Sequence, residues 1–166
     1  MKEQIHVIDK RKVSNKELKQ ILLENKNIKF VSLMGVDLGG NSTDEKIPVS
    51  LLLDDVDDFL KSAIQTDGSS VELYDIATLN NAKVDLMPDV NSKWYVDYNL
   101  ENIDPETGLA VGTLKIPALL IHDNKRVGSR GILRKAQSNF KKSLIGIFEE
   151  YPKIINSIGV DSVNDI

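Results

Sequence analysis

The sequence predicts an α+β fold, in which short strands precede one long helix. Apolar segments with the length and alternation of β-strands occupy most of the chain, and an apolar stripe with a 3.6-residue period follows near its end. Apolar residues make up 41% of the 166 residues, which is enough to bury a core and excludes a disordered chain.

The first predicted element is a helix over residues 15–26. Ser14 and Glu17 have capping-box spacing, because a hydroxyl at the N-cap and a carboxylate three residues later can each bond the other's backbone N–H. Leucine and isoleucine follow at helical spacing. The helix is therefore predicted to be short and amphipathic.

A β-hairpin is predicted next. Residues 28–37 are apolar on both faces of a strand, which is typical of a strand with neighbours on both sides or with both faces covered. Residues 39–42 are predicted to form the turn, and residues 46–49 the returning strand. Pro48 cannot donate to a ladder, so it confines the returning strand to an edge.

Residues 53–64 are predicted to form a helix, because aspartates fill its first turn and apolar residues follow. Residues 66–70 are predicted to form a polar loop. Residues 84–87 and 94–98 are predicted to pair as strands.

Two elements complete the predicted fold. Residues 114–121 give a strand, bulged or at an edge at Pro117, after a turn that begins at Asp104. Ser129 opens the long helix, and Pro152 stops or kinks it. Its apolar stripe comprises Ile132, Leu133, Ala136, Phe140, Leu144, Ile147, Phe148 and Tyr151.

Composition limits the classes of function. The 21 basic residues do not outnumber the 25 acidic ones, which argues against a nucleic-acid partner. No cysteine is present, so a disulfide scaffold, a thiolate metal site and a cysteine nucleophile are excluded. No apolar run has the length of a membrane helix or a signal peptide. The sequence predicts a soluble, cytoplasmic protein.

Most polar motifs have a simple structural interpretation. Gly39-Gly40 lacks the lysine and spacing of a phosphate loop and predicts a hairpin turn. His6 and His122 lack the neighbouring ligands of a zinc or di-iron site. The aspartates of residues 54–58 lack calcium-loop spacing, and Lys10-Arg11-Lys12 is interpreted as solvated surface.

Asp67-Gly68-Ser69-Ser70 is different in kind. Gly68 permits a positive φ, so the flanking carboxylate and hydroxyls can converge on one small polar solute. Taken alone, the motif is better explained as a turn that satisfies its own polar groups.

The wider sequence resembles the amino-terminal domain of glutamine synthetase from about residue 28 to about residue 136. The resemblance rests on the order and spacing of several motifs rather than on one. These are Asn27-Ile28-Lys29-Phe30-Val31, Ile47-Pro48-Val49, Asp67-Gly68-Ser69-Ser70, Leu86-Met87-Pro88-Asp89 and Gly128-Ser129-Arg130-Gly131-Ile132-Leu133.

The resemblance implies a β-grasp fold, a small mixed sheet packed on a helix. It implies an extension with a helix over 1–27, the β-grasp domain over 28–124 and the helical start of a catalytic domain over 125–166. The family joins glutamate to ammonia through γ-glutamyl phosphate, using ATP with Mg²⁺ or Mn²⁺. Its active sites lie between subunits of a homo-oligomeric ring.

Carried over by position, Asp67 matches the family aspartate that binds ammonium and helps to deprotonate it, and Ser70 matches the serine beside it. Gly68, Ser69 and Tyr74 are expected to support the loop and the subunit interface. Tyr74 replaces a tryptophan that is common in the family, and Lys83 stands where an acidic residue is frequent. These departures leave open a divergent branch or a different amine substrate.

The length adds a further expectation. No catalytic domain follows in these 166 residues, so the resemblance implies a fragment of a longer enzyme that binds no cofactor and is inactive alone. Two alternatives stay open: a relative that joins glutamate to another amine such as a polyamine, and a free-standing β-grasp module that binds partners at a sheet edge near Pro48 or Pro117.

Overall fold

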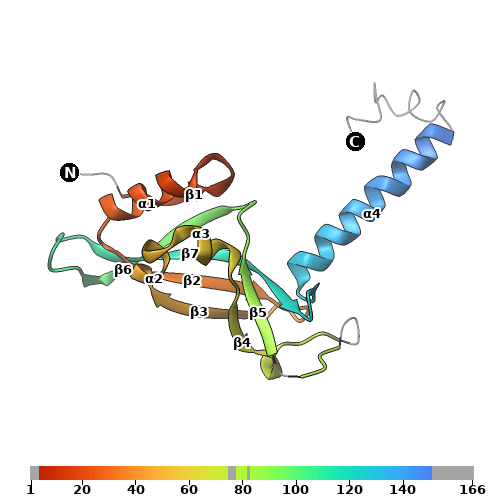
Figure 1. Ribbon diagram of the computed structural model, residues 1–166, viewed down its shortest axis with the longest axis horizontal. Helices are drawn as coiled ribbons and strands as arrows, with labels where there is room; N and C mark the ends of the chain where they lie inside the picture. Colours follow the sequence, from red (N-terminus) through yellow and green to blue (C-terminus); the bar gives the residue numbers. More distant parts are fainter. Residues whose placement is uncertain (1–3, 75–77, 82, 151–166) are drawn as a thin grey trace. The chain divides into compact units, whose positions relative to one another are not determined.

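The computed structural model describes residues 4–74, 78–81 and 83–150, and the chain divides into two units, residues 1–129 and 130–166. In Figure 1 the first unit is a sheet with helices packed on it, and the second contains most of the last helix. The strands are β1 Val7–Asp9, β2 Ile28–Val36, β3 Ser42–Pro48, β4 Ile64–Asp67, β5 Lys83–Pro88, β6 Lys93–Ile103, β7 Ala110–His122 and β8 Lys125–Arg126. The helices are η1 Lys10–Lys12, α1 Asn15–Glu24, α2 Val49–Asp54, α3 Val56–Lys61, η2 Gly68–Ser70 and α4 Ser129–Glu150.

The sheet is built around β7. Its main path runs β1-β6-β7-β2-β3, while the second half of β7 pairs with β5 and β8, and β5 pairs with β4. β2 and β7 are parallel, and the other paired strands are antiparallel. This mixed sheet confirms the predicted α+β class and fits a β-grasp.

Pro117 lies where β7 changes partners. The β6 ladder ends at Lys115, Pro117 is opposite Met34 of β2, and the β5 ladder begins at Ala118. The predicted bulge or edge at Pro117 is therefore wrong. A proline is tolerated here because its missing N–H falls between two ladders.

β5 and β6 do not pair with each other, so that part of the prediction is also wrong. Both strands pair with β7, at its opposite ends. The chain between them is held at the carbonyl of Asp89, which accepts hydrogen bonds from Ser92 Oγ at 2.7 Å and from the indole Nε1 of Trp94 at 3.1 Å. The chain thus passes from β5 to β6 through an anchored connection, without a tight hairpin.

The helix predicted over 53–64 is confirmed only as the shorter α3, and it is preceded by a separate helix, α2, most of which was not predicted. Asp55 separates them with an extended φ of −145°, and its side chain accepts a hydrogen bond from the N–H of Asp58 at 2.9 Å. The aspartate thus begins a new helix instead of continuing the first one. Residues 64–67, predicted partly as loop, form β4.

The core lies between the sheet and helices α1, α2 and α3, with α2 and α3 lying across the sheet in Figure 1. Trp94 is fully buried in it. The helices contribute Leu18, Leu22, Leu52, Val56 and Leu60, and the central strands contribute Val31, Leu33, Leu114 and Ile116. At Gly35 a Cβ would lie 2.7 Å from Leu86, so glycine permits this close packing.

The predicted long helix is confirmed as α4. Leu133, Phe140 and Ile147 recur along it at seven-residue intervals, as an apolar stripe requires. Tyr151 and Pro152, which the prediction also placed at its end, lie outside the described residues. Among the described residues no helix has both the length and the apolar character needed to cross a membrane.

Candidate functional site

The Asp67 loop, Asp67–Ser70, lies at the turn that follows β4. Asp67 pairs across the β4–β5 ladder with Lys83, and η2 begins directly after it. The carboxylate organises the turn: Oδ1 accepts a hydrogen bond from the Ser69 N–H at 2.9 Å, and Oδ2 accepts one from Ser69 Oγ at 2.8 Å. Ser70 Oγ donates to the carbonyl of Asp67 at 3.0 Å. The loop is thus pre-organised by its own side chains.

The functional groups of the loop face solvent. Asp67, Ser69 and Ser70 are exposed, and Gly68 is buried. The backbone N–H and the hydroxyl of Ser69 lower the pKa of Asp67, so the carboxylate is charged at neutral pH. Among the described residues, no lysine, arginine or histidine nitrogen lies within 4.0 Å of that carboxylate.

An open depression of about 550 Å³ lies beside Asp67. It is lined by Glu45, Gln65, Thr66, Asp67, Asn81 and Lys83. These residues carry carboxylates, amides, a hydroxyl and one ammonium, which a polar solute could contact.

Tyr74 is presented outward in a strained backbone conformation. Its φ is +45°, a left-handed value that aromatic residues rarely adopt, and its side chain is 65% exposed. Its hydroxyl donates to Glu72 Oε2 at 2.6 Å, and this bond raises the pKa of Tyr74. The expected role of Tyr74 at a subunit interface stays a prediction.

Asp37 is a buried carboxylate that the sequence analysis did not single out. It directly follows β2 and is 2% exposed, and it bonds both the β2–β3 turn and the chain that leaves the Asp67 loop. The available signal was an aspartate placed two residues before Gly39-Gly40, a pattern typical of a side chain that bonds its own turn.

The other polar motifs have structural partners. His122 is buried, with Nδ1 2.7 Å from the carbonyl of Lys83, while Nε2 accepts a hydrogen bond from the Asn80 N–H at 2.9 Å. In the described part of the chain no group of three or more His, Cys, Asp or Glu could hold a metal ion.

The interpretation of Lys10-Arg11-Lys12 as solvated surface is wrong for Lys10. Lys10 is not solvated surface, because it is only 9% exposed and its ammonium donates to the carbonyl of Val13 at 2.8 Å. Its neighbour Arg11 instead forms an exposed ion pair with Asp9 at 2.7 Å.

Of the comparisons with known proteins, only the comparison with solved structures finds a similar protein. No family model and no curated protein matches the sequence. Glutamine synthetase from Plasmodium falciparum matches 78% of this chain with a TM-score of 0.57 and 18% identity, and this chain spans 23% of that one. The match with GmaS in complex with ADP covers 66% of this chain and 21% of the GmaS chain, with a TM-score of 0.44 and 17% identity. The match with GmaS without ligand covers 64% of this chain and 21% of the GmaS chain, with a TM-score of 0.41 and 15% identity. The predicted resemblance to glutamine synthetase is thus confirmed in the fold.

Proposed function

We propose that this chain is the amino-terminal domain of a cytoplasmic glutamine-synthetase-type ligase. In the assembled homo-oligomer it covers a neighbouring subunit's active site and supplies Asp67 and Ser70 to the ammonium site. The observation that carries the proposal is the exposed Asp67 carboxylate, which is fixed by neutral donors and has no cation from the described residues. The fold shared with glutamine synthetase supports it.

The chemistry of the loop suits ammonium. A carboxylate that is already oriented attracts a cation without reorganisation, and its unused lone pairs can accept the cation's N–H groups. The attraction strengthens when a neighbouring surface excludes water, because it varies inversely with the local dielectric constant. Once ammonium is bound, the same carboxylate lies within reach of the proton that must leave before the nitrogen can attack.

ATP, glutamate and Mg²⁺ or Mn²⁺ are assigned in this proposal to the remainder of the enzyme. Phosphoryl transfer needs metal ions and cationic clamps around the phosphates. The contribution proposed for this chain is limited to Asp67 and Ser70, with Gly68, Ser69 and Tyr74 shaping the loop and the interface.

The test is Asp67→Asn in the complete polypeptide that carries this chain. We expect ammonia-dependent glutamine formation to fall by about 10²-fold or more, since positioned acid–base groups contribute that much, while ATP binding is retained. Asp97→Asn is the matched control, because Asp97 is an exposed strand aspartate whose contact with Lys115 is long, at 3.8 Å. Undiminished glutamine formation by Asp67→Asn would contradict the proposal.

A second candidate is a ligase that joins glutamate to a larger amine. The depression beside Asp67 favours it, because its volume of about 550 Å³ is far more than ammonium needs and its lining includes a second carboxylate, that of Glu45. Assays of ammonia, methylamine and a diamine with the same two variants separate the candidates. Loss of ammonia use together with retained use of a larger amine would identify the second.

A further inference from the structure

The carboxylate of Asp37 connects two segments of the first unit. Oδ1 accepts a hydrogen bond from the Asn41 N–H at 2.8 Å, within the β2–β3 turn. Oδ2 accepts one from the Asn41 side-chain amide at 3.3 Å and one from the Glu72 N–H at 3.0 Å. Glu72 lies two residues after Ser70, so this last bond reaches the chain as it leaves the Asp67 loop.

The backbone strengthens the connection at the same residue. The N–H of Leu38, which follows Asp37, donates to the carbonyl of Glu72 at 3.0 Å. Glu72 is therefore held at both its N–H and its C=O by two consecutive residues of the β2 end. The other end of the loop is held by the β4–β5 ladder at Asp67 and Lys83.

The charge state of Asp37 is consistent with this role. Burial raises the pKa of Asp37, but hydrogen bonds from the backbone of Glu72, Asn41 and Gly39 and from the Asn41 side chain outweigh it and lower the pKa. The buried carboxylate is thus ionised at neutral pH and makes charge-assisted hydrogen bonds, which are stronger than neutral ones.

We propose that Asp37 is a positioning residue for the Asp67 loop. It fixes Glu72, and so sets where Ser69 and Ser70 lie relative to the carboxylate of Asp67. Only its effect on amine use rests on the proposed function. Its effect on the loop geometry does not.

The test compares Asp37→Asn and Asp37→Ala with the control Asp44→Asn by NMR of this chain. Asp44 belongs to the same hairpin, but its carboxylate accepts a hydrogen bond from Ser32 at 2.8 Å, within the β2–β3 ladder. Both Asp37 variants are expected to lower the hydrogen-exchange protection of the Glu72 amide by about tenfold or more. They are also expected to shift the Ser69 and Ser70 amide resonances and move the titration midpoint of Asp67 towards its ordinary value.

Amides of the β2–β7 ladder should be unchanged in all the variants, which shows that the fold is intact. Faster exchange at Glu72 with unmoved Ser69, Ser70 and Asp67 signals would overturn the proposal, because Asp37 would then anchor Glu72 alone. Failure of both Asp37 variants to fold would also overturn it.

In the complete polypeptide, Asp37→Asn should raise the KM for the amine at least several-fold more than the KM for ATP. If the loop signals move as expected while Asp67→Asn keeps full activity, the proposed function fails and the positioning role stands. If Asp67→Asn loses activity and the loop signals do not move, the proposed function stands and the positioning role fails.

Discussion

Two turns of this chain begin with an aspartate that bonds a nearby hydroxyl, yet they differ in what the charge can do. In the Asp67 loop, Oδ2 accepts a hydrogen bond from Ser69 Oγ at 2.8 Å. In the turn after β6, Oδ2 of Asp104 accepts one from Thr107 Oγ1 at 2.7 Å. The local hydrogen bonding is nearly the same.

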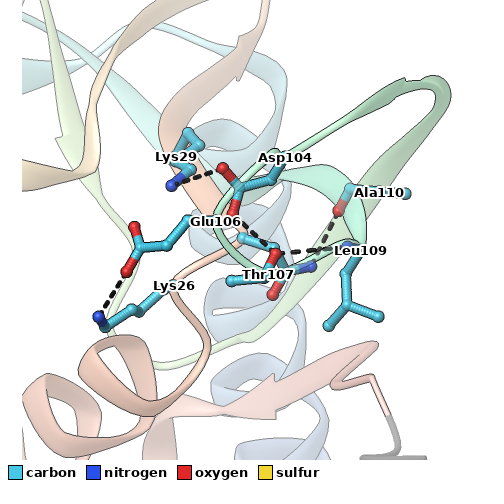
Figure 2. Close-up of polar contacts among 8 residues, drawn as sticks. Lys26, Lys29, Asp104, Glu106, Thr107, Leu109 and Ala110 are labelled. Atoms are coloured by element: carbon cyan, nitrogen blue, oxygen red, sulfur yellow. Dashed lines mark hydrogen bonds and ion pairs between the residues drawn. The ribbon is translucent and has the colours of Figure 1, made fainter.

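The surroundings of the two carboxylates differ. Asp104 is 3% exposed, and the ammonium of Lys29 on β2 lies 3.0 Å from its Oδ1. Figure 2 shows this ion pair. Asp67 is exposed, and in the part of the chain that the structure describes it bonds only neutral donors. A cation supplied by a neighbouring strand makes the first aspartate part of the fold, whereas the second has no such cation among the described residues.

The largest expected effect is on stability. Asp104→Ala should lower the melting temperature by roughly 4–8 °C, because it removes the acceptor that Thr107 and Lys29 share in a buried turn. Asp67→Ala should lower it by no more than about 2 °C, because the groups that it leaves unpaired can bond water. Calorimetry of the two variants at pH 7 checks this, and equal losses would remove the distinction between the turns.

The next effect is on acid stability. The Thr107 hydroxyl and then Lys29 lower the pKa of Asp104, with burial opposing them. A depressed folded-state pKa gives stability that is present above the unfolded value of about 3.9 and is lost as the pH falls through the folded value. The deficit of Asp104→Asn should therefore be full at pH 7 and should shrink below about pH 4.

Urea unfolding of wild type and Asp104→Asn at pH 7 and pH 3 measures that change. Asp67→Asn serves as the control and should differ little from wild type at both values. An Asp104→Asn deficit that is as large at pH 3 as at pH 7 would show that the charge of Asp104 is not its source.

The parts of the fold that sequence predicted well are local. The capping box of α1 is present in full, with Glu17 N–H to Ser14 Oγ at 3.2 Å and Ser14 N–H to Glu17 Oε2 at 2.8 Å. The β2–β3 hairpin and the start of α4 at Ser129 were also predicted from local pattern. In each case the deciding contacts span a few residues, so spacing alone defines them.

The errors in strand pairing are non-local. The partners of β5 and β6 depend on β7, which follows both of them in the chain, and no spacing within 84–98 encodes that choice. Asp37 was missed because its bond to Glu72 spans 35 residues. The Asp67 loop was found because its motif is contiguous. Its exposure, which carries the proposal, required the structure.

The smallest effect separates the two lysines drawn in Figure 2. Lys26 pairs with Glu106 at 2.6 Å, but both side chains are more than half exposed, so water and salt screen the pair. Lys29 instead pairs with the buried Asp104, and its loss leaves a carboxylate that cannot be well hydrated. Lys29→Met should lower the melting temperature by roughly 2–4 °C, and Lys26→Met by less than about 1 °C. Equal losses of melting temperature would show that the Asp104 turn behaves like the exposed turn of Asp67. A Lys29→Met loss that disappears in 0.5 M salt would show the same, since salt screens a buried pair far less than a surface one.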